Sequence, residues 1–299
     1  TPQARDIGSV NTLIRQPDGS LLGHNTDYDG FSYLLRSAGA QVRGRKTLVL
    51  GTGGASLTVR AVLRDLGAGE IVSVSRTGPD NYQNLDRHAD ARLIVNATPV
   101  GMYPNTGVSP VDLSLFPRLE GVFDLIYNPA RTQLLLDAER RGLLWANGLG
   151  MLTAQAKAAA EYFLGQHIPD GRVEEITREI QRQTCSVMLI GMPGCGKTTV
   201  GRELARQLGR ELVDTDALVE KQAGCTIPEL FAREGEEAFR RLEHQVLTQV
   251  GKQSGLVVAT GGGVVTRPEN RDPMRQNSTV VFLRRGLERL RLGAGPAHP

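Results

Sequence analysis

The chain has 299 residues, which is enough for about two domains that each bury a core. Its 35 Lys and Arg residues nearly balance its 32 Asp and Glu residues without forming a basic block, and only 5% of the residues are aromatic, so nucleic acid is not an expected partner. No apolar run approaches the ~18 residues of a membrane-spanning helix and no leader-like segment opens the chain, so we expect a soluble cytoplasmic protein without a membrane partner.

The first half of the chain alternates strand-like and helix-like segments. Residues 46–76 contain an apolar run, a glycine-rich turn, an amphipathic segment and a second apolar run, which is the order of a βαβ unit. Residues 91–99 and 121–129 are further strand-like runs, and residues 151–166 and 172–183 have helical patterns. This alternation predicts a doubly wound parallel sheet.

The glycine-rich turn of the first half reads GTGGAS. Gly51 and Gly53 fit the first two glycines of a dinucleotide-binding turn, whereas Ser56 replaces the third. Backbone N–H groups at the start of the following helix can hold a pyrophosphate. The second strand ends with Ser75 and Arg76, where an acidic residue would select NAD, so the arginine favours the 2′-phosphate of NADP. The alternative is a turn that only packs a helix on the sheet, with Arg76 in solvent.

The second half of the chain predicts another α/β domain. The string GMPGCGKT, residues 191–198, follows an apolar run and precedes a helix expected at 197–208, which is the context of a P-loop. Backbone N–H groups of such a loop hold phosphates, Lys197 reaches the β and γ oxygens, and the Thr198 hydroxyl binds Mg²⁺. Further strands are expected at 211–216, 255–263 and 278–283, and helices at 227–250.

Five strings around the first glycine turn occur in a fixed order: IGSVNTL, GHNTDYDGF, NATPVGM, DLIYNPARTQLL and NGLGMLTAQA. Together they resemble the shikimate dehydrogenase family over residues 1–183. The resemblance implies a Rossmann-type NADP-binding domain and the reduction of 3-dehydroshikimate to shikimate by NADPH. Quinate dehydrogenase is the alternative, because its substrate differs from shikimate by one hydroxyl.

The same resemblance implies which residues form the dehydrogenase site. Asp27 would be catalytic, whereas read alone it would be a turn or helix-cap residue. Asn11, Tyr127 and Gln155 would contact the substrate. The cofactor would be bound by Gly51, Gly53, Gly54, Ala55, Ser75, Arg76, Thr77, Asn96, Ala97, Thr98, Gly148 and Met151.

Three strings after the P-loop, VDTDALVE, IPELFAREGEEAFRRLE and ATGGGVV, resemble the shikimate kinase family from about residue 186 onwards. The resemblance implies an adenylate-kinase-like P-loop kinase domain with parallel α/β structure over residues 184–299, which transfers a phosphoryl group from ATP to shikimate. It implies that Asp216 and Lys197 are catalytic, that Asp214 joins Thr198 in binding Mg²⁺, and that Glu243 supports Arg240. Substrate would be bound by Arg240, Gly261, Gly262 and Gly263, and ATP by Gly191, Gly194, Cys195, Gly196, Lys197, Thr198 and Thr199.

The two predicted reactions are consecutive, because reduction of the ring ketone creates the hydroxyl that the kinase phosphorylates. The chain therefore resembles a fusion of two enzymes of aromatic amino acid biosynthesis, with small-molecule substrates and no predicted oligomeric state.

The chain also departs from both families. The lysine that pairs with Asp27 in dehydrogenases belongs to a domain that would precede Thr1, so we expect a fragment. The lid arginine of the kinases has no match, and Arg284, Arg285, Arg289 and Arg291 are expected on a solvated face. An alternative reading is therefore a nucleotide-binding scaffold without turnover.

Overall fold

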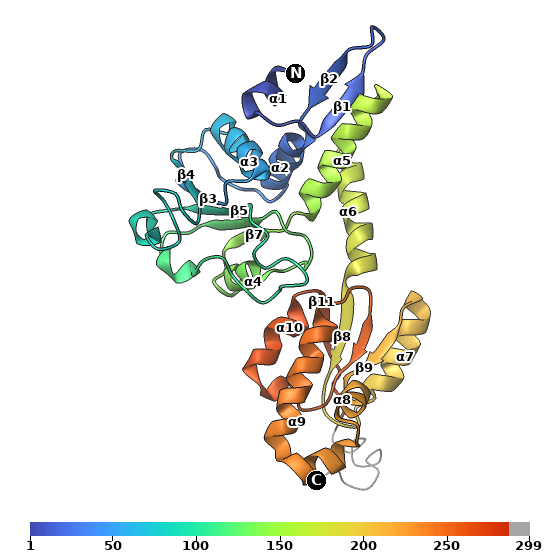
Figure 1. Ribbon diagram of the computed structural model, residues 1–299. Helices are drawn as coiled ribbons and strands as arrows, with labels where there is room; N and C mark the ends of the chain where they lie inside the picture. Colours follow the sequence, from blue (N-terminus) through green and yellow to red (C-terminus); the bar gives the residue numbers. More distant parts are fainter. Residues whose placement is uncertain (287–299) are drawn as a thin grey trace. The chain divides into compact units, whose positions relative to one another are not determined.

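The computed structural model describes residues 1–286 and divides the chain into two units, Thr1–Ile180 and Gln181–Pro299 (Figure 1). The helix α6 (Gly171–Thr184) contains this boundary and also the boundary expected from the sequence at residues 183/184. Each unit has its own sheet and its own buried clusters, so we describe the units separately.

The first unit opens with a short helix and a hairpin ahead of the parallel sheet. Helix α1 (Pro2–Ile7) precedes the antiparallel strands β1 (Thr12–Arg15) and β2 (Leu21–His24). Helix α2 (Thr26–Ser37) follows directly, and its N-cap is Asn25, whose side chain accepts a hydrogen bond from the backbone N–H of Tyr28. This cap fixes where the helix begins and so where its first turn lies.

Five parallel strands form the main sheet of the first unit. In spatial order they are β4 (Ile71–Val74), β3 (Thr47–Leu50), β5 (Leu93–Asn96), β6 (Gly121–Asp124) and β7 (Leu144–Ala146). The chain leaves β3 toward β4 and then crosses to β5 on the other side, so β3 lies at the point where the strand order reverses. Ligands of open α/β sheets bind at the carboxyl ends of the strands beside such a point.

Side chains alternate between the two faces of this sheet. Val49 packs with α2, α3 (Gly54–Asp65) and α5 (Leu149–Leu164), whereas Leu48 and Leu50 pack with α4 (Gln133–Arg140). The 3-10 helices η1 (Leu85–His88) and η2 (Leu113–Leu115) cover the same face as α4. Fully buried side chains on both faces explain why the strands read as continuous apolar runs.

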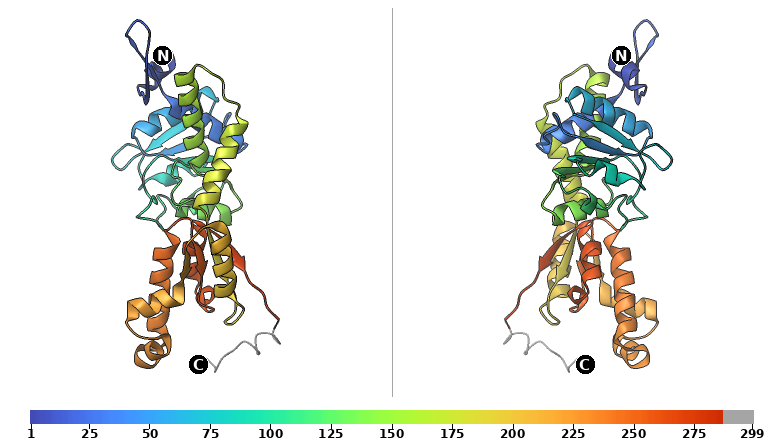
Figure 2. Two further views of the ribbon diagram at one scale, coloured as in Figure 1. Left: turned by 90° about the vertical axis from the view of Figure 1, so that its right-hand side faces the viewer. Right: turned by 90° about the vertical axis from the view of Figure 1, so that its left-hand side faces the viewer.

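The second unit has a four-stranded parallel sheet in the order β11 (Ser278–Phe282), β8 (Ser186–Ile190), β10 (Val257–Ala259), β9 (Leu212–Asp214). Helix α7 (Lys197–Leu208) covers one face. The other face carries α8 (Thr215–Ala223), α9 (Ile227–Gly251) and α10 (Arg271–Arg275), and the 3-10 helices η3 (Val264–Thr266) and η4 (Pro268–Asn270) follow β10. Figure 2 shows helices on both sides of these strands.

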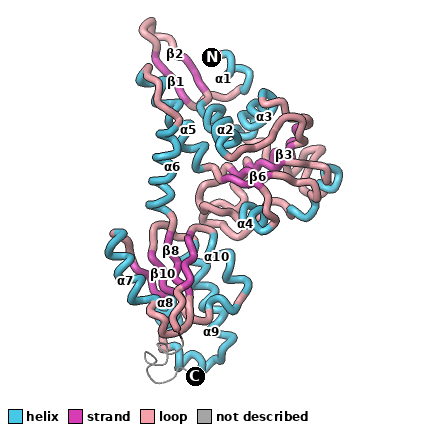
Figure 3. The backbone as a smooth tube through the Cα atoms, turned by 180° about the vertical axis from the view of Figure 1, so that it is seen from behind, coloured by secondary structure: helices cyan, strands magenta, loops and turns pink. Residues whose placement is uncertain are grey.

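Both sheets are parallel and both are flanked by helices, as Figure 3 shows by secondary structure. The predicted fold class, a Rossmann-type domain followed by a P-loop α/β domain, is confirmed. Among the helices of residues 1–286, none combines the length and the apolarity needed to cross a membrane.

Candidate active sites

A cavity of about 650 Å³ opens at the carboxyl ends of β3, β4 and β5 in the first unit. Gly51 immediately follows β3 with φ +103°, and a Cβ there would approach Thr98 Cγ2 to 2.9 Å, so only glycine lets the turn close against the loop after β5. Helix α3 begins at Gly54, so its free N–H groups lie beside this turn. The predicted residues that line the cavity are Gly51, Gly53, Ser75, Arg76, Ala97 and Thr98.

The end of the cavity at β4 carries a positive charge without an acidic partner among its lining residues. Arg76 is exposed there, and the Ser75 hydroxyl oxygen accepts a hydrogen bond of 2.8 Å from Gly78 N–H, which orders the loop after the strand. Tyr82 also lines the cavity and was not predicted, because its position depends on how the loop after β4 folds back. Thr77 is exposed in this loop but does not line the cavity. A guanidinium in this place suits the 2′-phosphate of NADP.

A second cavity of about 390 Å³ shares Ala97 and Thr98 with the first. Ala55, a predicted cofactor residue, and Tyr127, a predicted substrate residue, line it. Met102 and Tyr103 also line it and were not predicted, although Met102 ends the string NATPVGM that begins at Asn96. The two cavities therefore form neighbouring compartments around the loop after β5.

Asn96 does not line either cavity. It is completely buried at the end of β5, where its Oδ1 atom accepts hydrogen bonds from Thr98 N–H (3.0 Å) and Thr98 Oγ1 (2.6 Å). Its Nδ2 atom donates to Asp124 Oδ1 (3.0 Å). At the end of β5 the side chain of Asn96 points into the core. It is therefore linked to the two cavities through its hydrogen bonds with Thr98, which lines both of them.

Asp27 on α2 and Gln155 on α5 lie near the predicted substrate residue Asn11, which precedes β1. Asp27 is half-buried in the first turn of α2; burial raises the pKa of its carboxyl group, and a hydrogen bond with Asn11 opposes that rise. The Asn11 Oδ1 atom also accepts from Thr26 N–H at 2.9 Å. Because Asn25 rather than Asp27 caps the helix, the Asp27 carboxylate is left for another role.

Helices α2 and α5 approach closely at Gly30, one turn after Asp27. A Cβ on Gly30 would lie 2.7 Å from the carbonyl oxygen of Met151 and 3.2 Å from Gln155 Cβ. Gln155 therefore packs beside the first turns of α2, while Met151 is buried between the helices and the sheet. Gly148 lies just before α5, and its N–H donates to Ile126 O at 3.0 Å.

The second unit has a cavity of about 580 Å³ at the P-loop. Five of the predicted ATP-binding residues line it: Gly194, Gly196, Lys197, Thr198 and Thr199. Lys197 Nζ donates to Gly191 O (2.8 Å) and Met192 O (3.0 Å), so its ammonium group spans the loop.

Two predicted ATP-binding residues of the loop do not line the cavity. Cys195 is buried, and its Sγ atom would lie 2.9 Å from a Cβ placed on Gly191. Cys195 and Gly191 therefore pack the loop against the unit, and only their backbone groups remain to face a ligand.

The predicted metal ligands come together. Thr198 Oγ1 donates to Asp214 Oδ2 at 3.0 Å, which joins the first turn of α7 to the end of β9. A hydroxyl and a carboxylate in this place fit Mg²⁺, which is bound in such proteins through one or two protein oxygens together with phosphates and water. Within residues 1–286 no group of three or more Asp, Glu, His or Cys side chains is placed to hold a metal by itself.

Asp216 lies between the P-loop and the glycine triplet. Burial, followed by repulsion from Asp214 and Glu243, raises the pKa of Asp216 to about 6, and Lys197 opposes the rise. A Cβ on Gly261 would lie 2.6 Å from Asp216 Oδ1 and 2.8 Å from Glu243 Oε1, so the triplet needs glycine to approach these carboxylates. A Cβ on Gly262 would likewise lie 2.5 Å from Pro193 Cδ, and one on Gly263 would overlap the Arg240 guanidinium.

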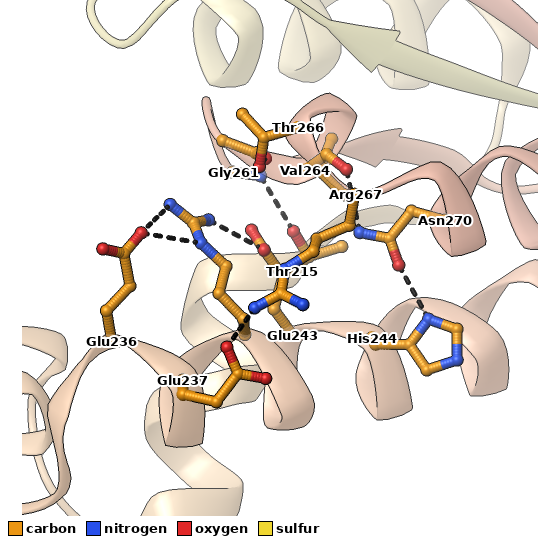
Figure 4. Close-up of polar contacts among 12 residues, drawn as sticks. Thr215, Glu236, Glu237, Glu243, His244, Gly261, Val264, Thr266, Arg267 and Asn270 are labelled. Carbon is orange, nitrogen blue, oxygen red and sulfur yellow. Dashed lines mark hydrogen bonds and ion pairs between the residues drawn. The ribbon is translucent and has the colours of Figure 1, made fainter.

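Arg240 is fixed by two carboxylates of its own helix. Its Nη1 atom donates to Glu243 Oε2 (2.9 Å), and its Nε and Nη2 atoms donate to Glu236 Oε1 (3.3 and 3.2 Å). Figure 4 shows Glu236 and Glu243 directed at one guanidinium, and the hydrogen bond from Gly261 N–H to Thr215. The predicted support by Glu243 is present; Glu236, one turn earlier on α9, was missed although its spacing from Arg240 is that of an i,i+4 pair.

Arg285 is exposed, as expected, but its contact with the P-loop was not predicted. It lines the P-loop cavity, and its Nη1 atom donates to Gly194 O at 3.3 Å. The reason is topological: β11 pairs with β8, so the residues after β11 run beside the P-loop that follows β8. Arg284 is exposed, whereas Arg289 and Arg291 lie outside the described residues.

Comparison with known proteins separates the two halves of the chain. Residues 193–292 match the family model described as shikimate kinase. The shikimate kinase of Synechococcus sp. (strain CC9902) is 60% identical over 85 residues, which are 28% of this chain and 44% of that protein. The shikimate dehydrogenase (NADP(+)) of Clostridium perfringens (strain 13 / Type A) is 34% identical over 192 residues, with 60% of this chain and 70% of that protein covered.

A solved structure supports the fold of the first unit. The crystal structure of shikimate 5-dehydrogenase from Thermus thermophilus in complex with NADP(H) and shikimate is 36% identical, with a TM-score of 0.53 over 60% of this chain and 71% of that one. The chain spans 44% of the length of the first kinase relative and 65% of that of the first dehydrogenase relative.

Proposed function

We propose that this chain, which belongs to the shikimate dehydrogenase family and carries a shikimate kinase match in its second unit, acts in two consecutive reactions. The first is the reduction of 3-dehydroshikimate to shikimate with NADPH, and the second is the phosphorylation of shikimate with ATP and Mg²⁺. The observation that carries the proposal is that each unit has a cavity of its own, one with Arg76 and one with Lys197 among its lining residues.

In the first unit, bound NADPH supplies a hydride. The turn at Gly51 and the start of α3 hold the pyrophosphate, and Arg76 binds the 2′-phosphate. Asn11 and Asp27 lie side by side and bind ring hydroxyls of the substrate, while Gln155 approaches from α5. The half-buried carboxylate of Asp27 also orients the group that protonates the new alkoxide.

In the second unit, bound ATP supplies the phosphoryl group. Backbone N–H groups of the P-loop and Lys197 hold the phosphates, and Thr198 with Asp214 holds Mg²⁺. Asp216 accepts the proton of the attacking hydroxyl, and Arg240, already oriented by two carboxylates, binds the substrate carboxylate. The guanidinium of Arg285 adds a further positive charge to this cavity.

The test is a pair of assays on the whole chain: NADP⁺-dependent oxidation of shikimate, and release of ADP on addition of shikimate and ATP·Mg²⁺. Each of Asp27→Asn and Asp216→Asn is expected to slow one reaction by about 100-fold or more and to leave the other unchanged, so the two variants control each other. Binding of both nucleotides without either reaction would favour a nucleotide-binding scaffold instead. Faster oxidation of quinate than of shikimate would favour the quinate alternative for the first unit.

A further inference from the structure

Asp124 is a buried carboxyl group that neither proposed reaction uses. It ends β6, its side chain is completely buried, and it is not among the residues that line either cavity of the first unit. Burial raises its pKa to about 7, although three hydrogen bonds oppose that rise. A buried carboxyl group costs free energy, so its presence at a position that neither reaction uses calls for a physical reason.

The hydrogen bonds of Asp124 join three segments of the first unit. Its Oδ1 atom accepts from Asn96 Nδ2 and from Ile126 N–H, both at 3.0 Å, and its Oδ2 atom accepts from Thr132 Oγ1 at 2.7 Å. Asn96 ends β5, Ile126 belongs to the loop after β6, and Thr132 is the N-cap of α4. The register places Asn96 and Asp124 side by side at the carboxyl edge of the sheet.

These segments build the wall of the cofactor cavities. Asn96 Oδ1 accepts both the backbone N–H and the hydroxyl of Thr98, and Thr98 lines both cavities with its methyl group turned toward Gly51. Ile126 lines the second cavity, and its carbonyl oxygen accepts the N–H of Gly148 at the start of α5. A single carboxyl group therefore connects the loop after β5 with the loop after β6.

The hydrogen bonds of Asp124 also fix which way the Asn96 carboxamide is turned, because a carboxamide has an acceptor at one end and a donor at the other. Asp124 Oδ1 also receives the backbone N–H of Ile126, which can only donate, so this oxygen stays an acceptor. It therefore binds the Nδ2 end of Asn96 and leaves Oδ1 to face Thr98. A proton on the carboxyl group would sit on Oδ2, toward the Thr132 hydroxyl, and would not change this orientation.

We propose that Asp124 is a positioning residue for the binding of NADP(H), acting through Asn96 and Thr98 on the turn at Gly51. This inference rests on the proposed dehydrogenase function of the first unit. It assigns the carboxyl group a role in shaping the cavity, with no direct contact to the cofactor.

The test compares two substitutions at position 124 by calorimetric titration of the whole chain with NADP⁺. Asp124→Ala removes the shorter of the two hydrogen bonds from Asn96 Nδ2, leaving only the one to Val100 O at 3.5 Å, and is expected to weaken NADP⁺ binding about 10-fold or more. Asp124→Asn can place its Oδ1 atom where the carboxyl oxygen was and donate to Thr132 Oγ1, so its affinity is expected to stay within about 3-fold of the parent chain. Binding of ATP·Mg²⁺ is expected to be unchanged in both.

Two further variants separate positioning from general stability. Thr98→Val keeps a methyl group toward Gly51 and the backbone N–H that donates to Asn96 Oδ1, but removes the hydroxyl contact with Asn96. It is expected to weaken NADP⁺ binding without additional loss when combined with Asp124→Ala. Thr58→Val removes a buried hydrogen bond of α3 to Asn25, outside this network, and is expected to lower the thermal midpoint while leaving NADP⁺ affinity unchanged.

The titrations distinguish failure of the positioning role of Asp124 from failure of the proposed dehydrogenase function. Equal NADP⁺ affinity in Asp124→Ala and the parent chain, or equal losses in Asp124→Ala and Asp124→Asn, would overturn the positioning role. If Asp124→Ala fails to fold, the double variant with Thr98→Val cannot be measured. In that case an unchanged NADP⁺ affinity in Thr98→Val alone overturns the positioning role. Failure of the parent chain itself to bind NADP⁺ would instead contradict the proposed function.

Discussion

At the scale of a single residue, the proposed function assigns the choice between NADP and NAD to Arg76. Its side chain is exposed at the end of β4 and lines the first cavity, where a 2′-phosphate would meet it. A charge-assisted hydrogen bond of this kind contributes about 1.5–3 kcal/mol, so Arg76→Ala is expected to weaken NADP⁺ binding about 10- to 100-fold and to leave the weaker binding of NAD⁺ unchanged. Titration of both dinucleotides measures the effect.

The control for this prediction is Arg118→Ala, which removes an equally exposed arginine from a loop of the same unit, away from the residues that line the cavities. It is expected to change neither affinity. A parallel loss of NADP⁺ and NAD⁺ affinity in Arg76→Ala would show that the residue supports the fold of the loop and does not read the phosphate.

The proposed role of Asp216 predicts the acidic limb of the pH profile of the kinase reaction. Because its pKa is raised to about 6, the carboxyl group is protonated below that pH and cannot accept the proton of the attacking hydroxyl. The kcat/KM for shikimate is therefore expected to fall about 10-fold per pH unit below pH 6. Asp216→Asn is expected to lower kcat by about 100-fold or more and to remove this limb. A limb centred near pH 4, or one that persists in Asp216→Asn, contradicts the assignment.

The sequence predicted the positions of site residues best where these residues belong to a short contiguous motif. Lys197 and Thr198 follow β8, Asp214 ends β9 and Asp216 comes just after it. Parallel pairing of both strands with β10 brings the two sets to the same edge of the sheet. Asn96, Cys195 and Arg285 were harder because the direction of a side chain at a strand end, or its distance from a loop, depends on tertiary packing. Asp124, the acceptor of the Asn96 amide, opens the string DLIYNPARTQLL, but the string does not show that its carboxyl group is buried against Asn96.

Gly148 determines how α5 meets the sheet at the scale of elements. A Cβ at this position would overlap the carbonyl oxygen of Leu125, immediately after β6. Gly148→Ala is therefore expected to destabilise the first unit by about 1–3 kcal/mol and to displace the start of α5. Chemical denaturation measures the first effect and NADP⁺ titration the second.

The matched control is Gly171→Ala, at the first position of α6, where a Cβ would meet nothing within 4 Å. It is expected to leave the free energy of unfolding unchanged or to raise it slightly, because alanine restricts the unfolded chain. Equal destabilisation by both substitutions would contradict the close approach of α5 to β6.

Elements with strong periodicity agreed with their sequence prediction. Helix α7 begins at Lys197 and ends at Leu208 as expected, because the P-loop glycines precede it and Gly209 ends it in a left-handed conformation. Strand β7 was not predicted, since its three residues are too few and too exposed to give an apolar run. The break of α9 at Gly235 (φ 80°) was also not predicted, because the apolar pattern of the segment continues on both sides of it.

At the scale of the whole molecule, the account requires that each unit respond to its own nucleotide. A ligand at 100 times its Kd stabilises the unit that binds it by about 2.7 kcal/mol. In thermal unfolding of the whole chain, NADP⁺ is therefore expected to raise the transition that Gly148→Ala lowers, and ATP·Mg²⁺ to raise a different one. One transition that both ligands shift together would argue against separately stabilised units.

The central claim is that the chain holds two nucleotides at once, each in the cavity of its own unit. Calorimetric titration with NADP⁺ and a non-hydrolysable ATP analogue with Mg²⁺, alone and in sequence, tests it most directly, with Arg76→Ala and Lys197→Ala as reciprocal controls. The account predicts one equivalent of each ligand, with affinities that do not change when the other is bound. Displacement of one nucleotide by the other, or the absence of binding by both, would contradict it.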